Sequence, residues 1–214
     1  MATIQSSNSP GKRVEIGDAV IESGRASNTS AVKKRFAEFE KQHRAYSVAA
    51  AMVARAEERV GKQQALIGEC DVVQDAAALR LASALAGDGL PRLNPFKPLG
   101  FPAPSVLIKV GYEKEAVQLV RLARAAARGK GASPTTRAAA KDAERAAEKL
   151  LAAQKPLAEL QRAYRDAITR RDALAQGWET AFAALKRGAR AAEDDGARGL
   201  FAALFERKAR PSAS

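Results

Sequence analysis

Residues 139–185, AAKDAERAAEKLLAAQKPLAELQRAYRDAITRRDALAQGWETAFAAL, decide the fold of this chain. Mostly small or apolar side chains recur there at alternating steps of four and three. The positions are Ala139, Ala143, Ala146, Leu150, Ala153, Leu157, Leu160, Tyr164, Ala167, Arg171, Leu174, Trp178, Ala181 and Leu185. A repeat of 3.5 residues keeps one face of a helix against a partner helix while both supercoil. The stretch therefore predicts a long helix with a seam, the row of side chains that faces a partner helix.

A second long helix is predicted over residues 30–86. Its apolar side chains recur at steps of seven, at Val32, Phe39, Tyr46, Val53, Val60 and Ile67. Thr29 or Ser30 can cap the amides of its first turn. The apolar set shifts after Gly61 and Gly68, which predicts a change of register or a bend there. The chain thus carries two heptad seams that can pair.

The composition supports thin helical packing rather than a broad globular core. Of 214 residues, 49 are alanine and only 5% are aromatic. Alanine buries little area, and strands would need more β-branched and aromatic residues. We expect an all-α fold, an elongated antiparallel helical bundle or coiled coil of two long helices and one shorter helix.

A proline-rich connector separates these helices at residues 87–104, which hold five of the nine prolines. Apolar residues alternate with the prolines, at Leu90, Leu93, Phe96, Leu99 and Phe101. Such a segment either packs on the chain's own helices or serves as a ligand for an aromatic groove, and we favour packing. The shorter helix follows at 105–128. A Ser133–Pro134 pair then starts the last helix, 134–187, which Pro156 is predicted to kink.

The two ends are predicted to lie outside the bundle of residues 30–187. Residues 1–29 are rich in Ser, Asn and Gly and are expected to be mobile, with a hairpin turning at Gly17–Asp18 as a weaker possibility. The tail, 188–214, contains a short amphipathic element whose large apolar groups are Leu200, Phe201, Leu204 and Phe205. These four residues either fold back onto the bundle or dock into a partner's groove or a membrane surface.

The residues offer little for catalysis. His43 is the only histidine and falls on a helix seam, where a partly buried structural role is expected. Cys70 is the only cysteine, so the usual His and Cys metal sites and an internal disulfide are excluded. We predict no enzyme activity, no cofactor and no metal site.

The net charge of +12 raises the alternative of a nucleic-acid partner. The excess is spread along the chain, and most basic residues alternate with acidic ones, as on a solvated helix face. The basic residues Arg121, Arg124, Arg128 and Lys130 are the candidate polyanion site. No aromatic residues lie among them and no nucleic-acid motif is present.

Three charged residues occupy predicted seam positions: Arg171 on the last helix, and Glu57 and Asp71 on the first. An arginine in a seam can pair with a carboxylate and fix the register of two helices. It can equally extend its charged end to water.

We therefore expect a non-enzymatic scaffold or adaptor that acts through coiled-coil packing and terminal docking segments. Its partners would be other proteins or further copies of itself, and a basic nucleic-acid-associated protein is the alternative. No signal-like segment opens the sequence, and the longest apolar run, Val48–Ala54, is too short for a bilayer. A cytoplasmic location without a transmembrane segment is expected.

Overall fold

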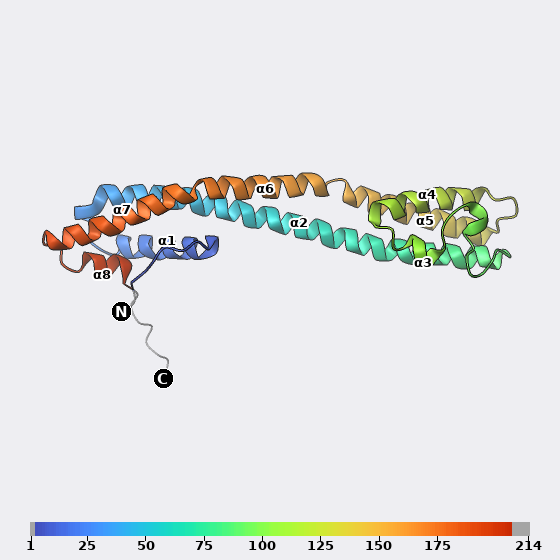
Figure 1. Ribbon diagram of the computed structural model, residues 1–214, viewed down its shortest axis with the longest axis horizontal. Coiled ribbons are helices and arrows are strands. Elements are labelled where there is room, and N and C mark those ends of the chain that lie inside the picture. Colours follow the sequence, from blue (N-terminus) through green and yellow to red (C-terminus); the bar gives the residue numbers. More distant parts are fainter. Residues whose placement is uncertain (1–2, 207–214) are drawn as a thin grey trace, which may run out of the picture. The chain divides into compact units, whose positions relative to one another are not determined.

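The computed structural model describes residues 3–206, and these residues fold as helices packed against one another, as Figure 1 shows. The prediction of an all-α bundle with long helices is confirmed. No strand forms within residues 3–206, where one antiparallel bridge joins Thr3 to Glu206. The α-helices are α1 (Pro10–Arg25), α2 (Lys33–Gly87), α3 (Pro104–Leu107), α4 (Tyr112–Arg128), α5 (Pro134–Gln154), α6 (Leu157–Ala173), α7 (Ala175–Asp194) and α8 (Leu200–Phe205).

The chain divides into two compact units. Unit 1 comprises residues 1–57 and 163–214, and unit 2 comprises residues 58–162. The helix α2 contributes its first part to unit 1 and its second part to unit 2. Each unit has a hydrophobic core of its own.

Unit 1 is held by aromatic side chains. Its core joins α1, the first part of α2, α7 and α8. The buried aromatic residues are Phe36, Phe39, Tyr46, Trp178, Phe182, Phe201 and Phe205. The rings of Trp178 and Phe182 stack with centroids 5.0 Å apart. Phe205 meets Phe182 edge-on at 5.6 Å, which ties α8 to α7.

The prediction of a mobile segment at residues 1–29 is corrected for its described part, which contains a packed helix. This helix is α1, which buries Ile16, Val20 and Ile21 in the core of unit 1. Gly17 lies inside this helix rather than in a hairpin turn, and a Cβ at that position would overlap the ring of His43. Glycine is needed here because α1 and α2 approach closely.

Unit 2 is built from α3, α4, α5 and the second part of α2, and its core is dominated by small side chains. The buried alanines are Ala77, Ala78, Ala82, Ala116, Ala123, Ala126, Ala140, Ala143, Ala146, Ala147 and Ala153. Leucines fill the remaining space, and Phe96 is the core's one buried aromatic residue within the described part of the chain. Small side chains allow the helix backbones to lie close together, as α4 and α5 do in Figure 1.

The proline-rich connector packs on unit 2. Phe96 is fully buried in the core, and Leu90, Leu99 and Phe101 pack against it half-buried. The structure supports the packed alternative over a free ligand for an aromatic groove. Leu93 is the exception, because 97% of its surface is exposed.

The predicted helix 134–187 is three helices, α5, α6 and α7, and α7 continues to Asp194. The first break follows from Pro156, which has no N–H to continue the ladder. Next to this break, the side chain of Gln63 donates to the carbonyl of Ala153, at 2.5 Å. The second break is a turn at Leu174, which no proline or glycine at that position explains. Ser133 caps α5 as expected, accepting a hydrogen bond from the amide of Thr136 at 3.1 Å.

The boundaries of two other predicted helices also change. The segment 105–128 is interrupted at Gly111, whose φ of 91° separates α3 from α4. At the start of the first long helix, a short 3-10 turn, Ser30–Val32, precedes α2. These differences move helix ends without changing the class of fold.

Candidate functional site

The predicted docking residues of the tail are buried in unit 1. Leu200, Phe201, Leu204 and Phe205 are all less than 10% exposed. Gly199, at φ 77°, turns the chain so that α8 packs on α7 and α1. Glu193 accepts a hydrogen bond from the amide of Phe201, and Arg190 lies over the Phe201 ring, 4.6 Å from its centroid. Docking through these residues is therefore corrected to folding back, while residues 207–214 lie outside the described residues.

The polar residues predicted on the seams do not form a register pair. Arg171 binds its neighbour Asp172, with Nη2 and Oδ1 at 2.7 Å. Glu57 is exposed, and Asp71 is half-buried in unit 2. Arg171 and the two carboxylates therefore have separate surroundings, and only Asp71 belongs to a cluster of polar groups.

The candidate polyanion site is on and beside α4, and its four basic residues are exposed. Arg124 is already engaged, because its guanidinium binds Glu144 at 2.6 Å and Glu148 at 3.3 Å on α5. These carboxylates raise the pKa of Arg124 and offset its charge. Arg121, Arg128 and Lys130 lie on either side of Arg124. Because two carboxylates offset the charge of Arg124, these four residues make a weaker phosphate-binding surface than the sequence predicted.

His43 is buried in unit 1, more completely than the partly buried role expected from its seam position, and it belongs to a chain of hydrogen bonds. Its Nδ1 accepts from Trp178 Nε1 at 3.1 Å, so its Nε2 carries the hydrogen that faces Asp18 Oδ1 at 2.8 Å. Beside it, the buried Arg13 donates to Glu179 at 2.7 Å and to the Tyr46 hydroxyl at 3.1 Å. Both His43 nitrogens are occupied by structural partners, so neither is available as a general base.

A cluster of buried and half-buried polar side chains lies in unit 2, between α2 and α4. Asp71 and Asp75 are one turn apart on α2, and Glu115 faces them from the first turn of α4. One carboxylate oxygen from each lies within 4.8 Å of the others. Gln74 of α2 is fully buried with both amide atoms unpaired, and one oxygen of Glu115 is also unpaired. Each such group costs about 1–3 kcal/mol when it lacks a partner.

Burial and mutual repulsion change the protonation of this cluster. Burial, together with the neighbouring carboxyls of Asp75 and Asp71, raises the pKa of Glu115 to about 7, against the lowering effect of the Gln74 amide. Burial and then Asp75 also raise the pKa of Asp71. These carboxyls are the only groups in the described residues that could together hold a metal ion.

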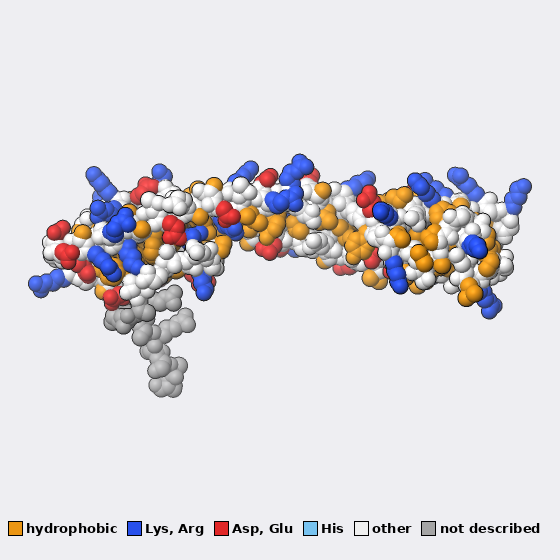
Figure 2. All heavy atoms as spheres, in the orientation of Figure 1, with side chains coloured by type: hydrophobic (Ala, Val, Ile, Leu, Met, Phe, Trp, Pro, Cys, Tyr) orange, Lys and Arg blue, Asp and Glu red, His pale blue; other side chains and the backbone are white. Residues whose placement is uncertain are grey.

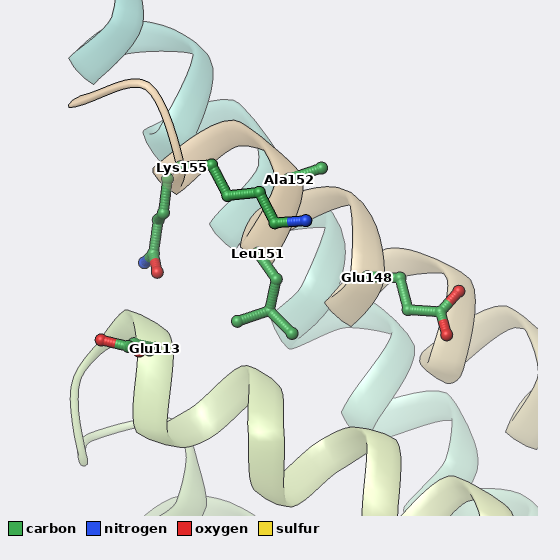
Figure 3. A pocket seen from close by; sticks show the side chains of 6 residues that line it. Glu113, Glu148, Leu151, Ala152 and Lys155 are labelled. Carbon is green, nitrogen blue, oxygen red and sulfur yellow. The ribbon is translucent and has the colours of Figure 1, made fainter. Parts of the chain in front are cut away.

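A separate pocket of about 440 Å³ lies between the start of α4 and the end of α5. In Figure 3, Leu151 points from α5 toward α4, while the carboxylates of Glu113 and Glu148 lie at opposite ends.

Four exposed apolar side chains lie on the part of α2 that belongs to unit 2. They are Leu66, Val72, Val73 and Leu79, which are 45–69% exposed, and we call them the outer row. Val72 and Leu79 share one side of the helix, and Leu66 and Val73 share the neighbouring side. Next to the outer row, a groove of about 860 Å³ separates the end of α2 from the start of α5. Figure 2 shows hydrophobic side chains at the surface over this unit. Among the described residues, no helix is long and apolar enough to cross a membrane.

Comparison of the chain with protein-family models, curated proteins and solved structures found no match. The sequence analysis predicted neither the carboxylate cluster nor the outer row. The sequence offers no cluster of His and Cys, but Asp71 and Asp75 are spaced to share one helix face. The spacing of Val72 and Leu79 by seven residues was the available signal for the outer row.

Proposed function

We propose that this chain is a non-enzymatic helical scaffold that assembles by packing the outer face of unit 2 against the same face of a second copy. The observation that carries the proposal is the outer row of α2. Val72 and Leu79 lie on the opposite side of the helix from the buried Leu81, so α2 has apolar side chains on two sides. Apolar side chains that the described part of the chain leaves exposed along a helix are typical of an interface.

The spacing of the residues on the side of α2 that carries Val72 and Leu79 fits a partner helix. Ala65, Val72, Leu79 and Ala86 recur at steps of seven, which is the repeat of a coiled-coil seam. Small residues line the adjacent groove, including Ser83 of α2 and Ala139 of α5. They allow a partner helix to lie close to α2, as helices already do within unit 2.

The charges of the groove favour a second copy as the occupant. Arg80 stands on the α2 wall of the groove and Asp142 on the α5 wall. In a two-fold dimer whose axis runs along the groove, each wall meets the opposite wall of the partner. Arg80 of each copy then faces Asp142 of the other, and both sides of the interface gain an ion pair.

The experiment is the molar mass of the full chain by light scattering during size-exclusion chromatography, over a range of protein concentrations. We expect a dimer that dissociates on dilution, and we expect Leu79→Glu or Val72→Glu to give a monomer with unchanged helix content. Val48→Glu is the matched control, because Val48 is 53% exposed on α2 but belongs to unit 1. A wild-type chain that is monomeric at every concentration would refute the proposal, as would a Leu79→Glu variant that dimerises like the wild type.

A further inference from the structure

The carboxylate cluster of unit 2 contains negative charge without a matching positive group. Asp71, Asp75 and Glu115 bring three carboxyls together, and Glu115 is only 2% exposed. Among the described residues, no Lys or Arg forms an ion pair with any of them. Buried carboxylates are ordinarily paired or bound to a metal ion, because an isolated buried charge is unfavourable.

Gln74 provides an independent indication that a ligand belongs here. Its side chain is fully buried on α2, between the positions of Asp71 and Asp75, and neither amide atom has a hydrogen-bond partner. The amide lies against the Glu115 carboxyl. Buried oxygens of Asp75 and Glu115 are unpaired in the same place. A bound cation would give these oxygens a common partner.

We propose that Asp71, Asp75 and Glu115 bind one divalent cation that links α2 to α4, with the amide oxygen of Gln74 as a further ligand. This site is independent of the proposed dimer, since it lies inside unit 2 and uses none of the outer-row residues. The ion is structural in this proposal. It holds together two helices whose facing side chains otherwise repel.

The donor atoms and their spacing favour calcium. All the donors are oxygens, which suits calcium, magnesium and manganese rather than zinc. Two oxygens on opposite sides of one ion are separated by at most twice the metal–oxygen distance, about 4.6–5.2 Å for calcium and about 4.0–4.2 Å for magnesium. The three carboxylate oxygens lie within 4.8 Å of one another, which is inside the range for calcium.

The test uses the full chain after treatment with a chelator, with calcium, magnesium or manganese chloride added as the probe. We expect saturable binding of one calcium ion per chain by isothermal titration calorimetry, and a rise in melting temperature that follows the same concentration dependence. Magnesium should bind more weakly. No binding of any of the three ions would refute the site, and stronger binding of magnesium would refute the assignment of calcium.

Substitutions of the carboxylates distinguish a cation-binding site from a cluster that has only a structural role. Glu115→Gln and Asp75→Asn remove charge, so each should raise the melting temperature of the metal-free protein while weakening calcium binding by more than about tenfold. Glu113→Gln is the matched control on the same helix, because Glu113 is exposed and outside the cluster. Its calcium response should equal that of the wild type. An unchanged calcium response in both Glu115→Gln and Asp75→Asn would overturn the proposal.

Discussion

The cores of unit 1 and unit 2 are built from different kinds of side chain, although both pack helices of the same chain. Unit 1 packs seven aromatic residues, including Trp178, whereas unit 2 packs mostly alanine and leucine. Aromatic rings bury large areas and pair in specific geometries, so a few of them can hold helices of unequal length. Alanine contributes little area, and its cores depend on close contact along the helix length. The stability of unit 1 therefore depends on a few large side chains, whereas that of unit 2 is spread over many small contacts along its helices.

The largest expected effect is the loss of the central ring of unit 1. Trp178→Ala removes contacts with Phe39, Tyr46 and Phe182 and leaves His43 Nδ1 without its donor. The free energy of unfolding should fall by about 3–5 kcal/mol, measured by chemical denaturation. Trp178→Phe keeps most of the ring and should lose less. If Trp178→Ala lowers the free energy of unfolding no more than Ala143→Gly does in unit 2, the proposed contrast between the two cores is wrong.

The next effect concerns pH and distinguishes unit 2. Burial first, and then the neighbouring carboxyls, raise the pKa of Glu115 from 4.5 to about 7, so in this range the metal-free folded protein retains a proton that the unfolded chain releases. Stability from this group is complete below pH 4.5 and is lost as the pH rises to about 7. The loss is at most about 3 kcal/mol.

The measurement is denaturation of the wild type and of Glu115→Gln, both with chelator present, across this pH range. The difference in unfolding free energy between them isolates Glu115 from other titrating groups. Glu115→Gln should gain on the wild type as the pH rises. A difference that does not change with pH would show that Glu115 titrates normally.

A smaller effect tests the close approach of α1 to α2 in unit 1. Gly17→Ala places a methyl group where the His43 ring lies, so the ring or the helix must move. Overpacking of this kind costs about 1–3 kcal/mol, against a gain in helix propensity of about 1 kcal/mol. We expect net destabilisation in thermal unfolding. Stabilisation by Gly17→Ala would mean that α1 does not pack at this distance.

The smallest effect has the opposite sign and serves as the matched control. Gly61 lies in α2 within unit 2, where an added Cβ would meet no atom within 4 Å. Gly61→Ala should therefore stabilise the protein by about 0.5–1 kcal/mol through helix propensity alone. The pair of glycine variants should differ in sign in the same thermal melts. Equal changes in melting temperature for the two variants would show that close packing is not the reason for glycine at position 17.

The sequence predicted the elements whose pattern is local. The heptad positions indicated the helices around Phe39, Leu150 and Trp178, and Ser133 marked the start of α5. Gly17 was misread as a turn residue, because close packing against His43 depends on a partner far along the chain. The same limit concealed the cation site, since Glu115 meets Asp71 and Asp75 only through the packing of α4 on α2. The tail residues were correctly identified as apolar, but their pattern alone did not distinguish folding back from docking.

The central claim is that the outer face of unit 2 meets a second copy, and a distance measured between chains tests it most directly. A spin label on Lys141→Cys, in a Cys70→Ala background, lies on exposed α5 beside Asp142 without lining the groove. Double electron–electron resonance should give a resolved distance between two labelled chains. The distance should disappear when Leu79→Glu is added and persist when Val48→Glu is added. A signal with no intermolecular component at concentrations up to the solubility limit would contradict the claim.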